Sequence, residues 1–447
     1  MPFKLSEESQ ETPDLAIANA RNHSDSSSYT DFPDKTERTP PVIGKRGAVQ
    51  RSEDVTAYLQ VVGAFFLMFN SWGVANTFGA YQNYYESALL KDETPSRISW
   101  IGSIQAFLLL LLGGLLTGPI FDAGHLRGLV IVGTVASVFG MMMTSICREY
   151  WQVVLAQGLV VGFGSGCMLL PSVAVFPQYF TKRRALATGL AAAGSSLGGV
   201  VYPTVFHELQ PKIGFGWTTR VIAFMMLGTL TIPLAVMRAK VFPSTRRPLF
   251  DFKVLRNMPY VLFSFGEFFG FMGMYIPFYY ITSYSLAKDI ANPNLSFYLL
   301  AIINAASIFG RIVPNFVADI SGPLNICGPF VLFCGIIAFC WTSVSSIGQI
   351  IVFCLFYGFF SGTFVSITGP SIASLSTDLS LVGTHMGMSF AAASLGLLVG
   401  NPVAGVLLDS YGWIGPAMFC GATNVLAGIC VVLARVSKTG KVWVVKA

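Results

Sequence analysis

The chain has 447 residues, of which 53% are hydrophobic and only 11% are charged, and its formal net charge is +6. Soluble domains contain about 25% charged residues, so this composition excludes an ordinary water-soluble protein and indicates a membrane protein. The eight cysteines include no CxxC pair and the four histidines do not cluster. We therefore expect no disulfide framework, no metal site and no cofactor.

Residues 1–55 differ from the rest of the chain, because they are rich in Ser, Thr, Asp, Glu and Pro. Such a segment buries too little apolar area to offset its ordering entropy, so we predict a disordered cytoplasmic tail. It lacks the basic and apolar regions of a cleaved signal peptide. The first hydrophobic span is therefore expected to serve as the insertion signal.

Twelve stretches are long and apolar enough to cross a bilayer, for which a helix needs roughly 20 residues. They lie at about 57–82, 98–120, 126–147, 151–176, 184–206, 217–238, 259–286, 295–318, 324–346, 348–372, 381–408 and 412–435. The expected fold is an all-α membrane protein of twelve transmembrane helices. We divide it into a bundle at 56–238, a basic cytoplasmic linker at 239–258, a second bundle at 259–435 and a cytoplasmic tail at 436–447.

The placement of Lys and Arg predicts the orientation. With the N-terminal tail in the cytoplasm, seventeen of them flank inner helix ends and six flank outer ends. Both termini are then cytoplasmic, and we expect a multi-pass protein of the plasma membrane, with a vacuolar or other internal membrane as the alternative. The sequon "NLS" would lie outside, which makes Asn294 a glycosylation candidate.

The two halves contain the same pattern of small residues and acids. Gly113 and Asp122 correspond to Gly310 and Asp319, at an offset of 197 residues (310 − 113 = 319 − 122). Further pairs in the fourth and fifth spans recur in the tenth and eleventh at nearly the same offset. Six spans per half give a same-direction repeat, which is typical of the major facilitator fold. Such proteins work by alternating access, in which two bundles rock around a central site.

Several long blocks carry a resemblance to a known family. They include "ISWIGSIQAFLLLLLGGLLTGPIFDAGHLRG", "IGFGWTTRVIAF" and "LLAIINAASIFGRIVPNFVAD". These blocks resemble the fungal branch of the monocarboxylate-porter family in the major facilitator superfamily. The resemblance implies twelve spans and secondary transport of small organic molecules. Similar fungal members include riboflavin and carboxylate permeases and transporters encoded beside secondary-metabolite genes.

The chain departs from the family pattern at two informative places. The first span has no Lys, and Ser307 stands where proton-coupled animal members carry an Asp one turn before the Arg. These departures argue against proton–monocarboxylate symport by the animal mechanism. We therefore favour efflux of a secondary metabolite, with uptake of a monocarboxylate or riboflavin as the alternative. A non-transporting nutrient sensor is a second alternative, and no constellation of an enzyme is visible.

Arg311 lies in the middle of an apolar span, where an arginine costs roughly 2.5–3.5 kcal/mol on insertion scales. Asn304, Ser307, Arg311 and Asn315 form one polar stripe at helical spacing. Two interpretations remain open. Arg311 either bonds neighbouring-helix carbonyls or a carboxylate, or it faces a cavity and binds an anionic substrate through its planar fork.

Glu267 is the other embedded charge, about nine residues into the seventh span. It either pairs with Arg311, carries the coupling proton, or lies in the inner vestibule. It is the proton-coupling candidate because it is the only deeply placed acid.

Further candidates are assigned from helix position and from the family. The resemblance implies a cytoplasmic gate, for which the matching residues are Asp122, Arg127, Arg183, Arg184 and Asp319. The predicted substrate-binding residues besides Arg311, Asn304 and Ser307 are Asn70, Asn76, Tyr81, Tyr275 and Tyr279. One Arg among aromatics suits a weakly acidic or aromatic molecule. The expected partners are this substrate, the lipid bilayer and protons, with the chain a monomer.

Overall fold

The computed structural model describes residues 43–180, 183–238, 248–376, 378 and 381–440. The predicted tail up to residue 42, linker residues 239–247 and the last residues from 441 lie outside this set. The chain divides into a unit that ends at Val49 and a unit that begins at Gln50. The helical bundle belongs to the second unit.

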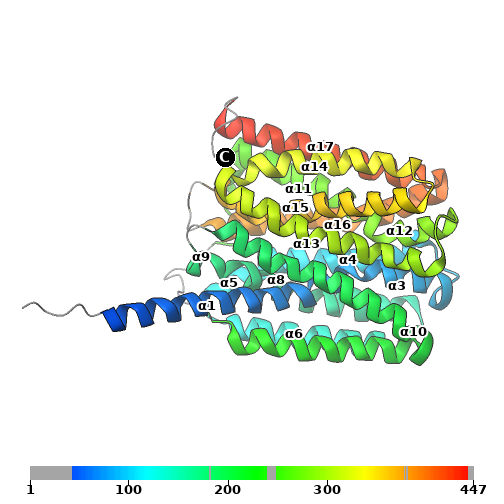
Figure 1. The fold of residues 1–447 in the computed structure, drawn as a ribbon, viewed down its shortest axis with the longest axis horizontal. Coiled ribbons are helices and arrows are strands. Elements are labelled where there is room, and N and C mark those ends of the chain that lie inside the picture. Colours follow the sequence, from blue (N-terminus) through cyan, green and yellow to red (C-terminus); the bar gives the residue numbers. More distant parts are fainter. Residues whose placement is uncertain (1–42, 181–182, 239–247, 377, 379–380, 441–447) are drawn as a thin grey trace, which may run out of the picture. The chain divides into compact units, whose positions relative to one another are not determined.

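The described residues form helices and loops, with no strand among them (Figure 1). The first half contains α1 (Ile43–Asn70), α2 (Trp72–Asn76), α3 (Phe78–Tyr84), η1 (Tyr85–Leu89), α4 (Pro95–Leu111), η2 (Leu112–Leu116), α5 (Thr117–Asp122), α6 (Leu126–Thr144), α7 (Tyr150–Val153), η3 (Val154–Val161), α8 (Gly162–Ala174), α9 (Phe176–Tyr179) and α10 (Arg184–Val236). The second half contains η4 (Phe252–Arg256), α11 (Met258–Met274), α12 (Ile276–Ala287), α13 (Pro293–Ser321), α14 (Pro323–Cys340), η5 (Trp341–Ser343), α15 (Ile347–Leu375), α16 (Val382–Tyr411) and α17 (Ile414–Thr439).

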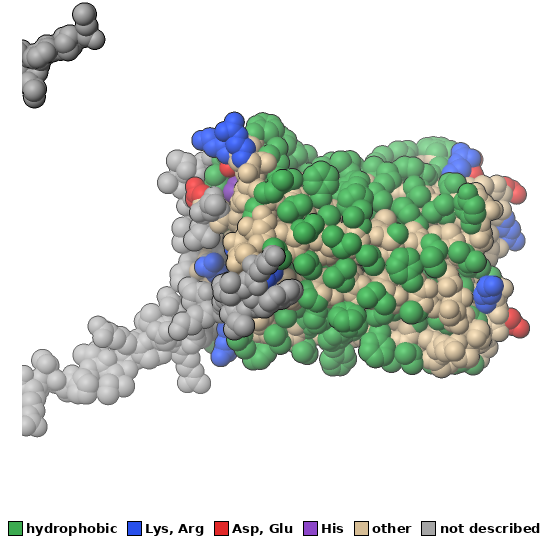
Figure 2. Space-filling model, turned by 90° about the horizontal axis from the view of Figure 1, so that it is seen from above, with side chains coloured by type: hydrophobic (Ala, Val, Ile, Leu, Met, Phe, Trp, Pro, Cys, Tyr) green, Lys and Arg blue, Asp and Glu red, His purple; other side chains and the backbone are tan. Residues whose placement is uncertain are grey.

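Among the described residues, eleven helical stretches are long and apolar enough to cross a membrane. One of them, α10, has 53 residues and would measure about 80 Å, more than twice the roughly 30 Å of a hydrocarbon core. Gly214 interrupts it with a φ of 77° and a ψ of 166°, at a kink that joins two helices. Figure 2 shows hydrophobic side chains over the face in view and charged side chains gathered at its two ends, as lipid contact requires.

Local sequence signals explain where several helices begin. Thr94, Asn292 and Ser346 each accept a hydrogen bond from the backbone amide three residues later. Proline follows Thr94 and Asn292 as the first residue of α4 and α13, where its missing N–H costs nothing. These caps fix the start of three membrane-spanning stretches.

Three segments predicted as tail or linker contain helix. The helix α1 begins at Ile43, so the last part of the predicted disordered tail is helical. The linker contains the short helix η4, and α17 continues to Thr439, beyond residue 435. A helix is held by main-chain hydrogen bonds, so a polar segment can continue a helix beyond the membrane-spanning part.

Contacts between the halves run along two helix pairs, α10 with α13 and α4 with α16. We call the end of these helices that adjoins linker residues 248–257 the linker end, and the opposite one the far end. At the far end, Tyr298 donates a hydrogen bond to Glu208 (2.8 Å), and the rings of His207 and Phe297 stack at 4.2 Å. Both contacts join α10 to α13 at the far end.

Candidate substrate cavity

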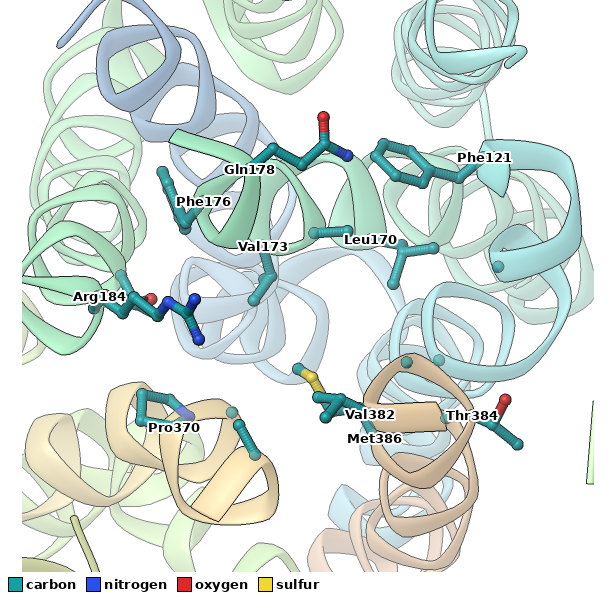
Figure 3. Close-up of a pocket in the computed structure, with 18 of the residues that line it drawn as sticks. Phe121, Leu170, Val173, Phe176, Gln178, Arg184, Pro370, Val382, Thr384 and Met386 are labelled. Carbon is teal, nitrogen blue, oxygen red and sulfur yellow. Dashed lines mark hydrogen bonds between the residues drawn. The ribbon is translucent and has the colours of Figure 1, made fainter. Parts of the chain in front are cut away.

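A cavity of about 520 Å³ lies at the linker end between the two halves. Its lining includes residues of α5, α8 and α10 from the first half and of α13, α15 and α16 from the second. Val173 and Met386 project into it from opposite sides (Figure 3). A concave, mostly apolar site between two helical units is where a small organic ligand is expected to bind.

Three of the five predicted gate residues line this cavity. They are Asp122, Arg184 and Asp319. The side chain of Arg184 points into the cavity (Figure 3) and its Nε donates to the carbonyl of Phe180 at 2.9 Å. Arg127 and Arg183 are exposed and are absent from the lining. The cavity mouth therefore carries charge of both signs.

Asp319 joins the two halves at this mouth. Its two carboxylate oxygens accept hydrogen bonds from the backbone amides of Ala185 and Leu186, both at 3.0 Å. These amides belong to the first turn of α10, where the helix dipole favours a negative charge. Asp319 was predicted from the family as a gate residue, and these two donors to it are main-chain groups of the other half.

A smaller cavity of about 40 Å³ contains Arg311. It shares Val173, Thr188 and Gly369 with the larger cavity, so the two adjoin. The other lining side chains are mainly aromatic and aliphatic, with a few hydroxyls: Met68, Trp72, Leu110, Leu169, Ala192, Phe271, Val365, Ser366, Thr368 and Phe390. One guanidinium among aromatic rings suits an aromatic molecule with an acidic group.

Arg311 is only 3% exposed and contacts two neutral oxygens. Its Nε donates to Ser307 Oγ at 3.2 Å, and its NH1 group donates to the carbonyl of Ala192 on α10 at 3.3 Å. Among the described residues no ion pair involves Arg311, so the pairing with Glu267 that the sequence left open does not form. The side chain bonds a neighbouring-helix carbonyl and also lines a cavity, and the binding of an anionic substrate there stays a prediction.

Glu267 is fully buried within the second half, on the face of α11 that packs against α16. Its Oε2 accepts a hydrogen bond from Ser389, and its Oε1 has no partner among the described residues. Glu267 lines neither cavity. It is therefore placed beside the substrate path instead of in it.

Of the eight predicted substrate-binding residues, Arg311 alone lines either cavity. Asn70 is bonded to Tyr202 and Thr229 inside the first half, and Asn304 donates to the carbonyl of Leu300. Ser307 positions Arg311 and bonds Ser196 at 3.0 Å across the halves.

The other predicted side chains pack in this conformation. Tyr81 lies against Phe206, Tyr275 stacks on Trp72, Tyr279 contacts Phe78, and Asn76 donates to the carbonyl of Ser195. Asn294 is exposed in the first turn of α13, but Ser296 of its sequon is buried and bonded to Ser285. Their predicted roles stay predictions.

The linker supplies site residues that sequence reasoning missed. Pro248 and Leu249 line the larger cavity, and Thr384 donates to the carbonyl of Pro248 at 2.8 Å. Asp251 lies 3.2 Å from the Nε2 atom of His385. The hydrogen bonds from His385 and from the Lys253 amide hold the pKa of Asp251 below its ordinary value. No local pattern links residues so far apart, so only tertiary structure reveals this contact.

A cavity between two sets of membrane-spanning helices is the arrangement expected of a membrane transporter. Residues 61–376 match the Major Facilitator Superfamily, so the chain belongs to this superfamily and that part of the prediction is confirmed. It is 42% identical to the MFS-type transporter dbaD of Emericella nidulans, over 88% of this chain and 89% of that protein. It is 39% identical to the agnestins efflux protein AgnL12 of Paecilomyces divaricatus, over 86% and 88% of the two chains. The aspyridones efflux protein apdF of Emericella nidulans is 37% identical, over 83% of this chain and 76% of that protein.

Proposed function

We propose that the protein exports a weakly acidic, aromatic secondary metabolite by alternating access. The observation that carries this proposal is the guanidinium of Arg311, which lines the smaller cavity together with aromatic rings. Relatives that cover most of the chain are efflux proteins for agnestins and aspyridones, which supports the direction. The substrate of this chain is a molecule of the same broad kind, with an acidic group for Arg311.

The proposal includes twelve spans in two equivalent halves, with α10 counted as two spans on either side of Gly214. Two contacts support this symmetry. Gly189 of α10 approaches the backbone oxygen of Arg311, and Gly387 of α16 approaches that of Gly114. These residues correspond at offsets of 198 (387 − 189) and 197 (311 − 114). A duplicated bundle predicts such paired contacts across a pseudo-twofold axis.

We assign the linker end to the cytoplasmic side of the plasma membrane as part of this proposal. The basic residues Arg183, Arg184, Lys253 and Arg256 lie at this end, in accordance with the positive-inside rule. The conformation described then opens to the cytoplasm, where a metabolite made inside the cell would bind. We include Glu267 as the proton-coupling residue and a monomer as the working unit.

Transport in inside-out vesicles tests the role of Arg311. We expect Arg311→Gln to raise the KM for an aromatic carboxylic acid about tenfold to a hundredfold, because a charged hydrogen bond contributes roughly 1.5–3 kcal/mol. The KM for the neutral methyl ester of the same acid should change little. Measurements at two pH values separate loss of anion binding from loss of proton coupling.

Arg435→Gln provides the matched control, because Arg435 is also 3% exposed but lines neither cavity. Its KM values should resemble those of the unaltered protein. Equal transport of the acid by the Arg311→Gln variant, or an equal loss for the ester, would show that Arg311 is not an anion site.

A further inference from the structure

Polar side chains alternate along the contact between α11 and α16, inside an otherwise apolar bundle. Tyr260, Ser264 and Glu267 are 4 and 3 residues apart on α11, so they share one helix face. His385 and Ser389 are 4 residues apart on α16. Except for the partly exposed Ser264, all of them are buried, with exposed fractions of 2% or less.

The contacts connect these residues from the linker end inward. The hydroxyl of Tyr260 donates to the carbonyl of His385 at 2.7 Å, and the two rings are 5.7 Å apart. One turn further, Ser264 Oγ and Ser389 Oγ lie 3.0 Å apart. Ser389 in turn donates to the carboxylate of Glu267. The last three groups form a continuous hydrogen-bonded row.

Packing does not explain this row. Burying an acid is costly unless it is neutral or paired with a cation, and Glu267 has no ion-pair partner among the described residues. Hydroxyls are both donors and acceptors, so a row of them can reverse its direction. Ser389 can therefore donate to an ionised Glu267 or accept from a protonated one.

We propose that Tyr260, Ser264 and Ser389 form a proton path from the linker end to Glu267. This inference rests on the proposed function in that it treats Glu267 as the coupling residue. A hydronium ion at the linker end gives a proton to the Tyr260 oxygen and becomes water. The Tyr260 hydroxyl turns from the His385 carbonyl and passes its own proton to Ser264, one turn along the same helix face. Ser264 then passes its proton to Ser389, and Ser389 passes its own to Glu267 Oε2. Each hydroxyl forms one O–H bond and breaks one, so only Glu267 gains a proton.

The linker supplies the outer end of the path. The carboxylate of Asp251 is partly exposed and lies 3.2 Å from His385 Nε2, while His385 Nδ1 lies 2.9 Å from Ser376 Oγ. The His385 ring lies beside that of Tyr260, so this pair marks the outer end of the path.

The charged surroundings of Glu267 are sparse. From α14, Cys327 is the ionisable group within electrostatic range. The helix α15 has no acidic or basic residue, and α17 carries only Arg435 and Lys438, both in its last turns. On α16 the charged or ionisable residues besides His385 are Asp409 and Tyr411, at the far end. Glu267 is therefore the only acidic residue on α11, α14, α15 and α17.

Hydrogen–deuterium exchange of the Glu267 carboxyl, followed by infrared difference spectroscopy of the full chain in nanodiscs, tests this path. Glu267→Gln identifies the band of the protonated acid. After transfer to D₂O we expect at least tenfold slower exchange in Ser389→Ala, in Ser264→Ala and in Tyr260→Phe than in the unaltered chain. Ser389→Thr keeps the hydroxyl and should restore the rate.

The matched control is Ser394→Ala, which removes a buried hydroxyl of α16 that bonds the carbonyl of Ala391. Its exchange rate should equal that of the unaltered chain. An equal slowing in this control, unchanged rates in the three path variants, or no band from a protonated Glu267 would overturn the proposal. The exchange measurement uses no substrate. Its outcome therefore does not depend on whether the proposed export is correct.

Discussion

The hydrogen-bond partners of Arg311 are neutral, so its positive charge is available to a ligand. The hydroxyl of Ser307 and the carbonyl of Ala192 orient the guanidinium without cancelling its charge. A buried cation of this kind binds an arriving carboxylate or phenolate strongly, because the surroundings screen the charge poorly. The contact with α10 also makes the position of Arg311 depend on the arrangement of the two halves.

Gly189 of α10 lies in close contact with the backbone of Arg311. A methyl group on Gly189 would clash with the backbone oxygen of Arg311, which cannot move as a flexible side chain would. We expect Gly189→Ala to destabilise the protein by about 1–3 kcal/mol, as overpacking does. The melting temperature of the purified protein in detergent measures this loss.

Gly228 is the control for that substitution, since it lies on the same helix and nothing surrounds its Cβ position within 4 Å. Gly228→Ala should leave the melting temperature unchanged or raise it, because alanine favours the helix by about 0.5–1 kcal/mol. Equal melting temperatures for the two variants would contradict a close contact at Gly189.

At the scale of the helix, the start of α10 depends on the other half of the molecule. Main-chain amides of its first turn donate to Asp319 of α13, so an inter-half contact replaces a local cap. The side chain of Arg183, at the position before the helix, makes no capping hydrogen bond. Opening of this helix pair therefore leaves the first turn of α10 without these acceptors.

Asp319→Ala should destabilise the protein by about 0.5–2 kcal/mol, the usual effect of removing a helix cap, whereas Asp319→Asn should retain part of the contact. Faster hydrogen exchange of the Ala185 and Leu186 amides provides the local measurement. The control is Asp409→Ala, since Asp409 lies near the far end of α16 and is exposed. Unchanged exchange in Asp319→Ala would show that these bonds are absent in solution.

At the scale of the whole bundle, function requires that the far end open while the linker end closes. The stacked rings of His207 and Phe297 and the bond from Tyr298 to Glu208 must then separate. These contacts involve a few partly exposed side chains, which permits an exchange between states. The cavity at the linker end closes as α5, α10, α13 and α16 approach one another.

A cross-link at the far end should therefore stop transport. We would join His207→Cys and Phe297→Cys with a short, reducible bifunctional reagent, in a protein whose Cys340 and Cys430 are replaced by Ser. Transport in vesicles is expected to fall to background and to recover after reduction. Each single cysteine variant, treated in the same way, serves as control. Full transport by the cross-linked protein would exclude rocking of α10 against α13 at this end.

The sequence alone determined the class of the protein and its many membrane-spanning stretches, and it predicted the repeat, because these depend on composition and on the spacing of residues along the chain. Arg311 and Asp319 could also be identified as candidate functional residues from the sequence, because a charged side chain in an apolar span is energetically costly. Tertiary structure decided the partners: the Ala192 carbonyl for Arg311, the α10 amides for Asp319 and Ser389 for Glu267. It also showed that Asn70 is hydrogen-bonded inside the first half and that Trp72 and Phe271 line the smaller cavity. Helical periodicity gives the face on which a side chain lies, but which helix meets that face is fixed only when the whole bundle packs.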